Sequence, residues 1–327
     1  MKEIETKQTV LQYLAQHPKE WTSSKQLVET LNISRTAVWK AIKLLQEQNY
    51  QIDSQSGKGY FFTPNQTLSD AIIRNKIDSR WHLEVHDQVN STNLRAKELA
   101  AQLPIKQTVV VANEQTTGYG RFGRHFYSPS DTGIYISFLL PVTQTDFDPG
   151  LLTTGVAVAA AQAIEKQYPV NVKIKWVNDL IVNDHKVAGI LSEAIADVES
   201  RQISSVIVGI GINLAENDVV PADLRKKVGA ITEDNQQLDR NQTVVNVINE
   251  VSTLVDHPEI SYMKRYRERC MVIGKKATVR IGNEQFDGRV ETINDEGALV
   301  LNTKKGTQVV SAGEITKLNL KEGKYHG

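Results

Sequence analysis

The stretch VKIKWVNDLIVNDHKVAGILSEA, residues 172–194, decides the fold of the largest part of this chain. It contains three short apolar runs, 172–176, 179–184 and 186–194, which are separated by polar turn residues. A fourth run, SSVIVGIGINL, follows at 204–214. Short apolar runs bounded by Asn and Asp are typical of consecutive β-strands joined by hairpins. The stretch therefore predicts a sheet in which several neighbouring strands follow one another along the chain.

Helix and strand patterns alternate upstream of this stretch. QTVVVANEQ (107–115) and GIYISFLLP (133–141) are strand-like, whereas STNLRAKELAAQL (91–103) and LLTTGVAVAAAQAIEKQY (151–168) are helix-like. Helices collected at a few points among hairpin-linked strands indicate an α+β domain with a mixed sheet. We place this domain at residues 80–270.

Residues 1–63 read as three short helices followed by a hairpin. The third helix begins at Ser34, whose hydroxyl can cap the free amides, and Val38, Ile42 and Leu45 then recur at helical spacing. The strand-like runs NYQID and GYFFT flank the turn sequence SQSGKG. Three helices and a hairpin predict a winged helix-turn-helix whose recognition helix spans residues 34–48.

The outward side of that third helix and the hairpin carry most of the unit's local positive charge. Small three-helix units also serve as protein-docking modules, so DNA binding is one of two interpretations. Basic side chains at these positions supply phosphate contacts, which favours DNA. The candidate DNA-binding residues are Ser34, Arg35, Thr36, Lys40, Lys43 and Lys58.

Two further regions complete the organisation. Residues 64–79 begin with Pro64, are polar, and predict a linker leading into a short helix. Residues 271–327 contain short alternating strands, at 277–282, 286–293, 297–301 and 307–312, broken by Gly-Asn and Asp-Glu-Gly turns. This pattern predicts a small SH3-like β-barrel, in which no catalytic pattern is apparent. The whole chain is thus predicted to be an α+β multidomain protein.

The composition narrows the functional class. Acidic and basic residues number 38 each, so any DNA binding must come from a local patch rather than from overall charge. The only cysteine, Cys270, excludes an intrachain disulfide and a cysteine-based metal cage, and we assign no metal ligands. No apolar run has the length of a signal peptide or a membrane span. We expect a cytoplasmic protein without a membrane partner.

The segment TTGYGRFGRHFYSP, residues 116–129, is the first candidate for chemistry. It sets Arg121 and Arg124 among Gly118, Gly120 and Gly123. It is not a P-loop, because no Gly-Lys-Ser/Thr follows, and it does not open a helix as a dinucleotide fingerprint does. A flexible surface loop is the alternative. Because two neighbouring guanidiniums repel one another, we expect the loop to close around a phosphate- or carboxylate-bearing ligand.

Polar side chains in two other segments, together with Gln115 on the strand leading into the glycine loop, complete a candidate site. Each has a simple alternative, since a lysine at a strand edge is commonly solvated and a Ser-Thr-Asn run can cap a helix. Together they offer neutral groups for an amide or urea and cations for an anion, which suits activation of a carboxylate by nucleotidyl transfer. The residues are Ser91, Thr92, Asn93, Gln115, Lys175, Asn178, Asp179 and Lys186.

With these motifs in order, the chain resembles the bifunctional biotin–protein ligases and biotin-operon repressors over essentially its whole length. The matching motifs are Ser91-Thr92-Asn93, GYGRFGR, KWVNDL, KVAGIL and VGIGINL. The resemblance implies a class II synthetase-like ligase domain that converts biotin and ATP, with Mg²⁺, into biotinyl-5′-adenylate and pyrophosphate. The biotin then passes to a lysine of the carrier domain of acetyl-CoA or pyruvate carboxylase.

The resemblance also implies roles for individual residues. Lys186 and Arg121 are the catalytic residues, and Lys186 contacts the carboxylate and the α-phosphate oxygens. The biotin-binding set consists of these two with Ser91, Thr92, Asn93, Gln115, Tyr119 and Gly120. The nucleotide-side or supporting set is Gly118, Gly123, Arg124, Phe126, Lys175, Asn178, Asp179 and Asn213.

Three positions depart from the family pattern. Tyr119 stands where arginine is frequent, so one cationic contact is missing or is replaced by ring stacking and a backbone amide. Phe126 stands where tryptophan is common, a mild change if the ring packs on adenine. Val177 replaces the usual proline of the KWPNDL motif, from which we expect little consequence.

A ligase joined to a DNA-binding unit implies a switch. We expect the adenylate to order the glycine loop and complete a homodimer surface, which spaces two winged helices for a two-fold operator. Three alternatives remain: a biotin ligase without a transcriptional role, a lipoate ligase with a related catalytic fold, and a transcription factor with a degenerate sensor domain. The N-terminal unit disfavours the first. The ordered motifs and the SH3-like tail disfavour the second, and Arg121 with Lys186 the third.

Overall fold

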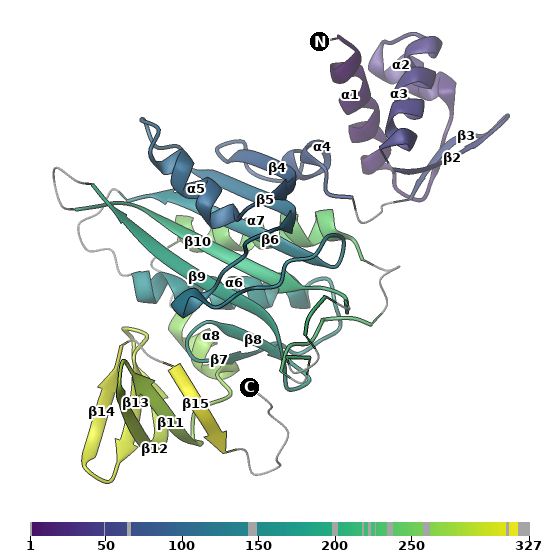
Figure 1. Cartoon of the computed structure of the whole chain (residues 1–327). Helices are drawn as coiled ribbons and strands as arrows, with labels where there is room; N and C mark the ends of the chain where they lie inside the picture. The colour runs from purple at the N-terminus through teal and green to yellow at the C-terminus, as the bar shows by residue number, and fades with distance from the viewer. Residues whose placement is uncertain are drawn as a thin grey trace. The chain divides into compact units, whose positions relative to one another are not determined.

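The computed structural model divides into two compact units (Figure 1). One comprises Met1–Ser79 with Gln237–Val245, and the other comprises Arg80–Gln236 with Asn246–Gly327. The residues that the structure describes are 2–48, 50–63, 67–142, 149–197, 202–217, 219–221, 224–225, 227–233, 238–257, 262–311 and 314–319. Within these ranges, every helix is too short or too polar to span a lipid bilayer. The domain boundaries predicted after residues 63, 79 and 270 stay predictions.

The N-terminal unit is a helix-turn-helix with a small sheet. Helices α1 (Lys2–Gln16), α2 (Ser24–Leu31) and α3 (Arg35–Glu47) pack around a core that includes Leu14, Leu27, Val38, Ile42 and Leu45. Strands β1 (Trp21–Thr22), β2 (Gln51–Gln55) and β3 (Gly59–Thr63) form an antiparallel sheet in the order β1-β3-β2. The Ser34 hydroxyl accepts a hydrogen bond from the Ala37 amide, 3.1 Å away. The prediction of a helix-turn-helix unit is confirmed.

The short helix predicted after the linker is α4 (Asp70–Arg74). Ser69 caps it, and the Ser69 amide donates to Oδ1 of Asn241 at 2.8 Å. Asn241 lies in the first turn of α7 (Arg240–Asp256), and its Nδ2 donates to the carbonyl of Thr67. The side-chain amide of Asn241 therefore links the segment before α4 to α7. Linker residues 64–66, which include Pro64, lie outside the described residues.

The central domain is built on a seven-stranded sheet in the order β4-β5-β6-β10-β9-β8-β7. Its strands are β4 (His82–Val89), β5 (Thr108–Gln115), β6 (Gly133–Pro141), β7 (Lys173–Lys175), β8 (Asp179–Val182), β9 (His185–Ala196) and β10 (Ile203–Asn213). Only β4 and β5 run parallel, so the sheet is mixed as the sequence predicts.

Helices cover both faces of this sheet (Figure 1). Helix α5 (Thr92–Ala100) lies on one face, where Ala96 packs against Leu139 of β6 and Ile207 of β10. Helix α6 (Pro149–Glu165) and the second half of α7 lie on the other face. There Trp81 donates a hydrogen bond to Ser252 and contacts Phe138 edge-on.

The C-terminal part is a five-stranded antiparallel sheet in the order β14-β13-β12-β11-β15. The strands are β11 (Lys276–Ile281), β12 (Glu284–Ile293), β13 (Leu299–Thr303), β14 (Gly306–Val310) and β15 (Glu314–Asn319). It packs against the central domain, since the Trp176 indole donates to the Gly297 carbonyl and Arg267, in α8 (Tyr262–Arg269), to that of Ile293. The predicted α+β architecture is confirmed, although β4 and β15 were not anticipated from sequence.

Candidate active site

A pocket of about 750 Å³ lies on the α5 side of the central sheet. It brings together fourteen of the sixteen residues that the sequence analysis assigned to the ligation site: Ser91, Thr92, Asn93, Gln115, Tyr119, Gly120, Arg121, Arg124, Phe126, Lys175, Asn178, Asp179, Lys186 and Asn213. The other two, Gly118 and Gly123, belong to the same loop but do not line the pocket. The structure thus gathers into one place side chains that are 122 positions apart in sequence, from Ser91 to Asn213. The role of each residue stays a prediction.

Glycines leave the face of the sheet beneath the pocket without side chains at two positions of β10. In the sequence VGIGIN of β10, Gly209 and Gly211 face α5, while Ile210 and Ile212 are buried. A Cβ at Gly209 would lie 2.2 Å from Asn93 Oδ1, and one at Gly211 would lie 2.4 Å from the Phe126 ring. Gly189 of β9 pairs directly with Gly211. The Phe126 ring therefore rests on a floor of two glycines, an arrangement that side chains at these positions would prevent.

The neutral end of the pocket is a pre-formed hydrogen-bond network. The Thr92 amide and hydroxyl both donate to Gln115 Oε1, at 2.9 and 3.1 Å, and Gln115 Nε2 donates to the Ser128 hydroxyl. The Ser137 hydroxyl, buried in β6, lies 2.7 Å from Thr92 Oγ1 and 2.6 Å from Asn93 Oδ1. These hydrogen bonds orient the Thr92, Asn93 and Gln115 side chains that line this end of the pocket.

Ser91 does not act as an ordinary helix cap. It occupies the N-cap position of α5, but its side chain makes no capping hydrogen bond. Its hydroxyl belongs to a residue that is only 3% exposed and lines the pocket. The simple capping interpretation of the Ser-Thr-Asn run is therefore wrong for the Ser91 side chain.

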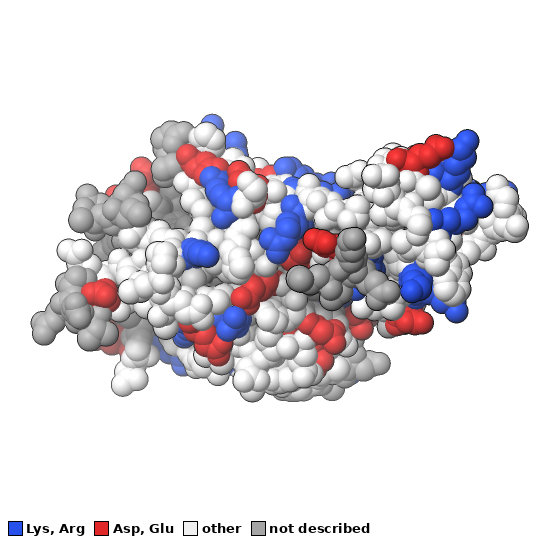
Figure 2. Space-filling view, turned by 90° about the horizontal axis from the view of Figure 1, so that it is seen from above, with Lys and Arg blue, Asp and Glu red and all other residues white. Residues whose placement is uncertain are grey.

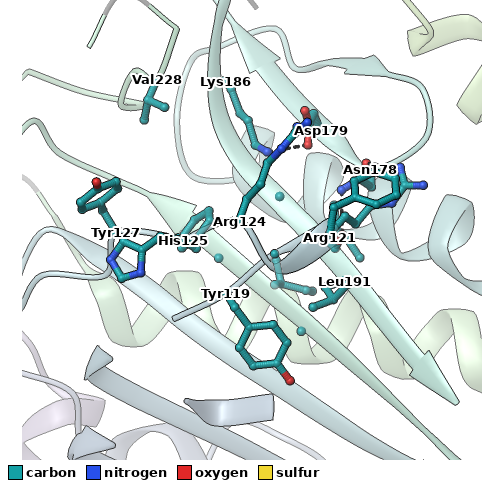
Figure 3. A pocket seen from close by; sticks show the side chains of 18 of the residues that line it. Tyr119, Arg121, Arg124, His125, Tyr127, Asn178, Asp179, Lys186, Leu191 and Val228 are labelled. Atoms are coloured by element: carbon teal, nitrogen blue, oxygen red, sulfur yellow. Dashed lines mark hydrogen bonds and ion pairs between the residues drawn. The ribbon is translucent and has the colours of Figure 1, made fainter. Parts of the chain in front are cut away.

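The cationic end of the pocket is formed by Lys186 and two arginines (Figure 3). Lys186 Nζ lies 2.7 Å from Asp179 Oδ1, and its chain bends over Gly189, where a Cβ would lie 3.3 Å from Nζ. Arg121 Nη1 lies 3.3 Å from Asn178 Oδ1, and Asn178 Nδ2 donates to the Ile190 carbonyl. These side chains converge from the glycine loop, β8 and β9.

The glycine loop, residues 118–126, is a hairpin-like turn rather than the start of a helix. The Gly120 amide donates to the Arg124 carbonyl at 2.8 Å, and the Phe126 amide to the Gly118 carbonyl at 2.9 Å. A single 3₁₀ turn, Arg121–Gly123, forms the tip, where Gly123 has φ +69°. Both guanidiniums approach the Phe122 ring, at 5.2 and 5.8 Å from its centroid. From the sequence we expected an anion to lie between these two guanidiniums. In the structure, the exposed Phe122 ring lies close to both of them.

A second segment covers Lys186 from the opposite side. The Lys186 amide donates to the Lys227 carbonyl, and the Gly229 amide donates to the Lys186 carbonyl, both at 2.9 Å. Asn213 Nδ2 donates to the Gly229 carbonyl at 3.2 Å and so holds this segment in place. Lys227 and Arg280 of β11 also line the pocket, and neither was anticipated from sequence.

Two further charged residues escaped the sequence analysis, Lys97 and Glu193. Lys97 Nζ lies 2.7 Å from Glu193 Oε1 and 3.1 Å from the Tyr119 hydroxyl, which itself donates to Glu193 Oε2 at 2.8 Å. Burial raises the pKa of the Tyr119 hydroxyl. Burial alone would raise the pKa of Glu193, but hydrogen bonds from Lys97, Asn93 and Tyr119 bring it below its usual value. Strand alternation from Leu191 could have pointed to Glu193.

The pocket contains little that could hold a metal ion by itself. Among its described lining residues, Asp179 is the sole carboxylate. Within the described ranges, no cluster of three or more His, Cys, Asp or Glu side chains could hold a metal.

The candidate DNA-binding residues are all exposed in the N-terminal unit. Ser34, Arg35, Thr36, Lys40 and Lys43 are exposed along α3, and Lys58 lies in the turn between β2 and β3. Lys43 Nζ lies 5.1 Å from the centroid of the exposed Trp39 ring. Acidic and basic side chains intermingle on the face shown in Figure 2. Helix α3 itself carries Arg35, Lys40 and Lys43 against Glu47, so its charge is locally positive.

Comparison with known proteins gives a consistent result. Residues 85–213 match the model of the biotin/lipoate A/B protein ligase family, residues 6–61 an HTH domain, and residues 272–318 the biotin protein ligase C-terminal domain. The chain is 31% identical to the bifunctional ligase/repressor BirA of Bacillus subtilis, over 94% of this chain and 97% of that one. It is 28% identical to BirA of Escherichia coli, over 91% and 93% of the two chains.

A solved structure shares the fold. The biotin protein ligase from Aquifex aeolicus in complex with biotin and ATP superimposes with a TM-score of 0.61 at 25% identity. The match covers 73% of this chain and 98% of that one.

Proposed function

The chain belongs to the family of bifunctional biotin ligases and repressors, and from this premise we propose how its pocket carries out the reaction. The protein is a biotin–protein ligase that uses biotin and ATP, and it is a repressor with a DNA-binding domain. The observation that carries the mechanism is the pocket itself. Its neutral hydrogen-bonding end and its cationic end lie within one cavity.

The first step joins two anions. A carboxylate oxygen of biotin attacks the α-phosphorus of ATP, the bond to the bridging oxygen breaks, and pyrophosphate leaves. Fixed cations aimed at the developing charge supply much of the rate enhancement of such a step. In this proposal Lys186, which lies 2.7 Å from Asp179 and over Gly189, would meet the carboxylate and the α-phosphate oxygens, and Arg121 would meet the phosphate. Ser91 and the Thr92–Gln115 network would hold the ring.

The second step consumes the mixed anhydride. The amine of a carrier lysine attacks the acyl carbon, an amide forms, and AMP leaves. Because an acyl-adenylate hydrolyses readily, water must be excluded until the carrier arrives, and a glycine-hinged loop can do this. Both positions require glycine: Gly123 has a positive φ, and a Cβ at Gly118 would lie 2.6 Å from the Phe126 carbonyl oxygen and 2.7 Å from the Ser128 hydroxyl.

Mg²⁺ fits this site as an ion bound mainly through the phosphates of ATP rather than as a metal held by protein side chains alone. Mg²⁺ is commonly bound by one or two carboxylates together with substrate phosphates and water. Asp179 is the described carboxylate that could contribute. When bound, the ion would neutralise charge on the departing pyrophosphate.

The decisive experiment is to incubate the protein with biotin, MgATP and a carboxylase carrier domain and to measure the intact mass of the carrier. We expect the gain of one biotinyl group per carrier. Equimolar lipoate in the same tube separates the two ligase classes, because a lipoyl gain in preference to a biotinyl gain would identify a lipoate ligase. A carrier left unmodified would contradict biotin ligation.

We further propose that repression requires a homodimer formed in the adenylate-bound state. One feature supports a sheet-to-sheet contact: Leu191–Ala196 of β9 pairs with β10 on one side, whereas β8 ends its described pairing at Gly189. A strand edge that has no described backbone partner can pair with another chain. Two winged helices would then face a two-fold operator. Sedimentation with biotin and ATP should show dimers, and unchanged monomers would contradict this proposal.

The double substitution Lys40→Ala/Lys43→Ala is expected to lower the affinity for the operator and to make that affinity less dependent on salt concentration. Each lysine that contacts a phosphate contributes about one unit to the slope of log affinity against log salt. The slope should therefore fall by about two units. Lys264→Ala, at an exposed position on α8, is the matched control. A slope equal to that of the unmodified protein would assign DNA binding to another surface.

A further inference from the structure

The Tyr119 side chain does not point toward the cationic end of the pocket. In Figure 3 its ring is directed away from Lys186 and Asp179, whereas Arg121, two residues later, lies beside Asn178. The hydroxyl ends at Glu193 Oε2, 2.8 Å away, with Lys97 Nζ at 3.1 Å. Two residues of the glycine loop are therefore attached to different parts of the sheet.

Helix α5 supplies two of the side chains that donate hydrogen bonds to Glu193. Asn93 and Lys97 are four residues apart, so they lie on the same face of the helix, and each donates to one oxygen of Glu193. The Asn93 side chain also contacts Ser137 and lies against Gly209 in the floor of the pocket. The carboxylate of Glu193 thus connects the loop to the same residue that orders the neutral end of the site.

We propose that Lys97, Glu193 and the Tyr119 hydroxyl form a latch that holds the glycine loop closed, and that Lys97 is a positioning residue for ligation. This inference rests on the proposed function and adds to it a residue that does not line the pocket. Lys97 and Glu193 are each about one-quarter to one-third exposed, so the loop can be released without stranding a fully buried charge. The latch and the Arg121–Asn178 contact secure the loop on either side of Gly120.

The latch predicts how the loop responds to its loss. Without the Tyr119 hydroxyl, the loop loses two hydrogen bonds to α5 and β9 while Lys97, Asn93 and Glu193 remain bonded to one another. The open form of the loop becomes more populated, and bound adenylate escapes more often. Because one latch contains both residues, removing Lys97 as well should add little.

The test measures dissociation of preformed biotinyl-5′-adenylate by chase with unlabelled adenylate, normalised to the amount each variant holds. Tyr119→Phe and Lys97→Met are each expected to accelerate dissociation about tenfold, and the double variant by less than the product of the two. Lys97→Arg keeps the cation and should restore retention to within about threefold of the unmodified protein. Lys106→Met, at an exposed lysine beyond α5, is the matched control and should change nothing.

The outcomes separate the latch from the proposed function. If the unmodified protein forms no adenylate, the proposed function fails first. If it forms adenylate and Tyr119→Phe retains it equally well, the latch alone is wrong. A lower melting temperature of Lys97→Met with an unchanged dissociation rate would also overturn the latch, because Lys97 would then have a structural role only. Multiplicative effects on the dissociation rate in the double variant would overturn it as well, because the two residues would then act independently.

Discussion

Replacing Lys186 with alanine is expected to slow biotinyl-5′-adenylate formation about a thousandfold, which corresponds to about 4 kcal/mol of transition-state stabilisation. The reason is the charge that develops as the carboxylate meets the α-phosphate. Lys186 is held in the pocket by Asp179 at 2.7 Å and by its passage over Gly189, with the 227–229 segment bonded to its backbone. No reorganisation is then needed at the moment of reaction.

Pyrophosphate release in a single turnover with biotin and MgATP measures this effect directly. The fold should survive, because the Lys186–Asp179 pair is partly exposed and such pairs contribute at most about 1 kcal/mol. Lys173→Ala removes an exposed lysine from neighbouring β7 and should leave the rate unchanged. A Lys186→Ala rate within tenfold of the unmodified protein would remove Lys186 from the catalytic role.

The strands that could be predicted are those whose side chains follow the burial pattern of the sheet. GIYISFLLP and SSVIVGIGINL are buried along nearly their whole length, so their apolar runs mark β6 and β10. Strand β4 lies at the sheet edge and carries Glu84, His86 and Asp87, which obscure its pattern. Strand β15 holds only Ile315 and Leu318 as apolar residues, and it becomes a strand by pairing with β11.

The site was predictable only as far as its residues form local motifs. The motifs give the list of polar residues, but the sequence does not show how far apart they lie in space. The Lys97–Glu193 pair joins positions 96 apart and depends on how α5 packs on β6 and β10, next to β9. Phe126 was assigned to the nucleotide side by motif, whereas its ring rests against Gly211 in the floor, a contact that no local pattern could indicate.

Arg121→Gly is expected to convert the protein into a source of free adenylate. Arg121 links the tip of the loop to Asn178, and its loss removes a charge-assisted hydrogen bond. It also brings the number of glycines in the stretch 118–123 from three to four, which raises the entropy of the open loop. Together these changes should speed adenylate release about a hundredfold. Synthesis should continue in part because Lys186 remains.

Released adenylate acylates any accessible amine, so the readout is biotin attached to lysines of a bystander protein that lacks a carrier domain. Arg121→Lys keeps a cation at the tip and should label the bystander less than Arg121→Gly does. The double variant Lys186→Ala/Arg121→Gly should label the bystander far more slowly than Arg121→Gly does, because the loss of Lys186 slows adenylate formation. Undiminished bystander labelling by the double variant would show that adenylate is made without Lys186. Tight retention of adenylate by Arg121→Gly would instead show that the loop closes without its guanidinium.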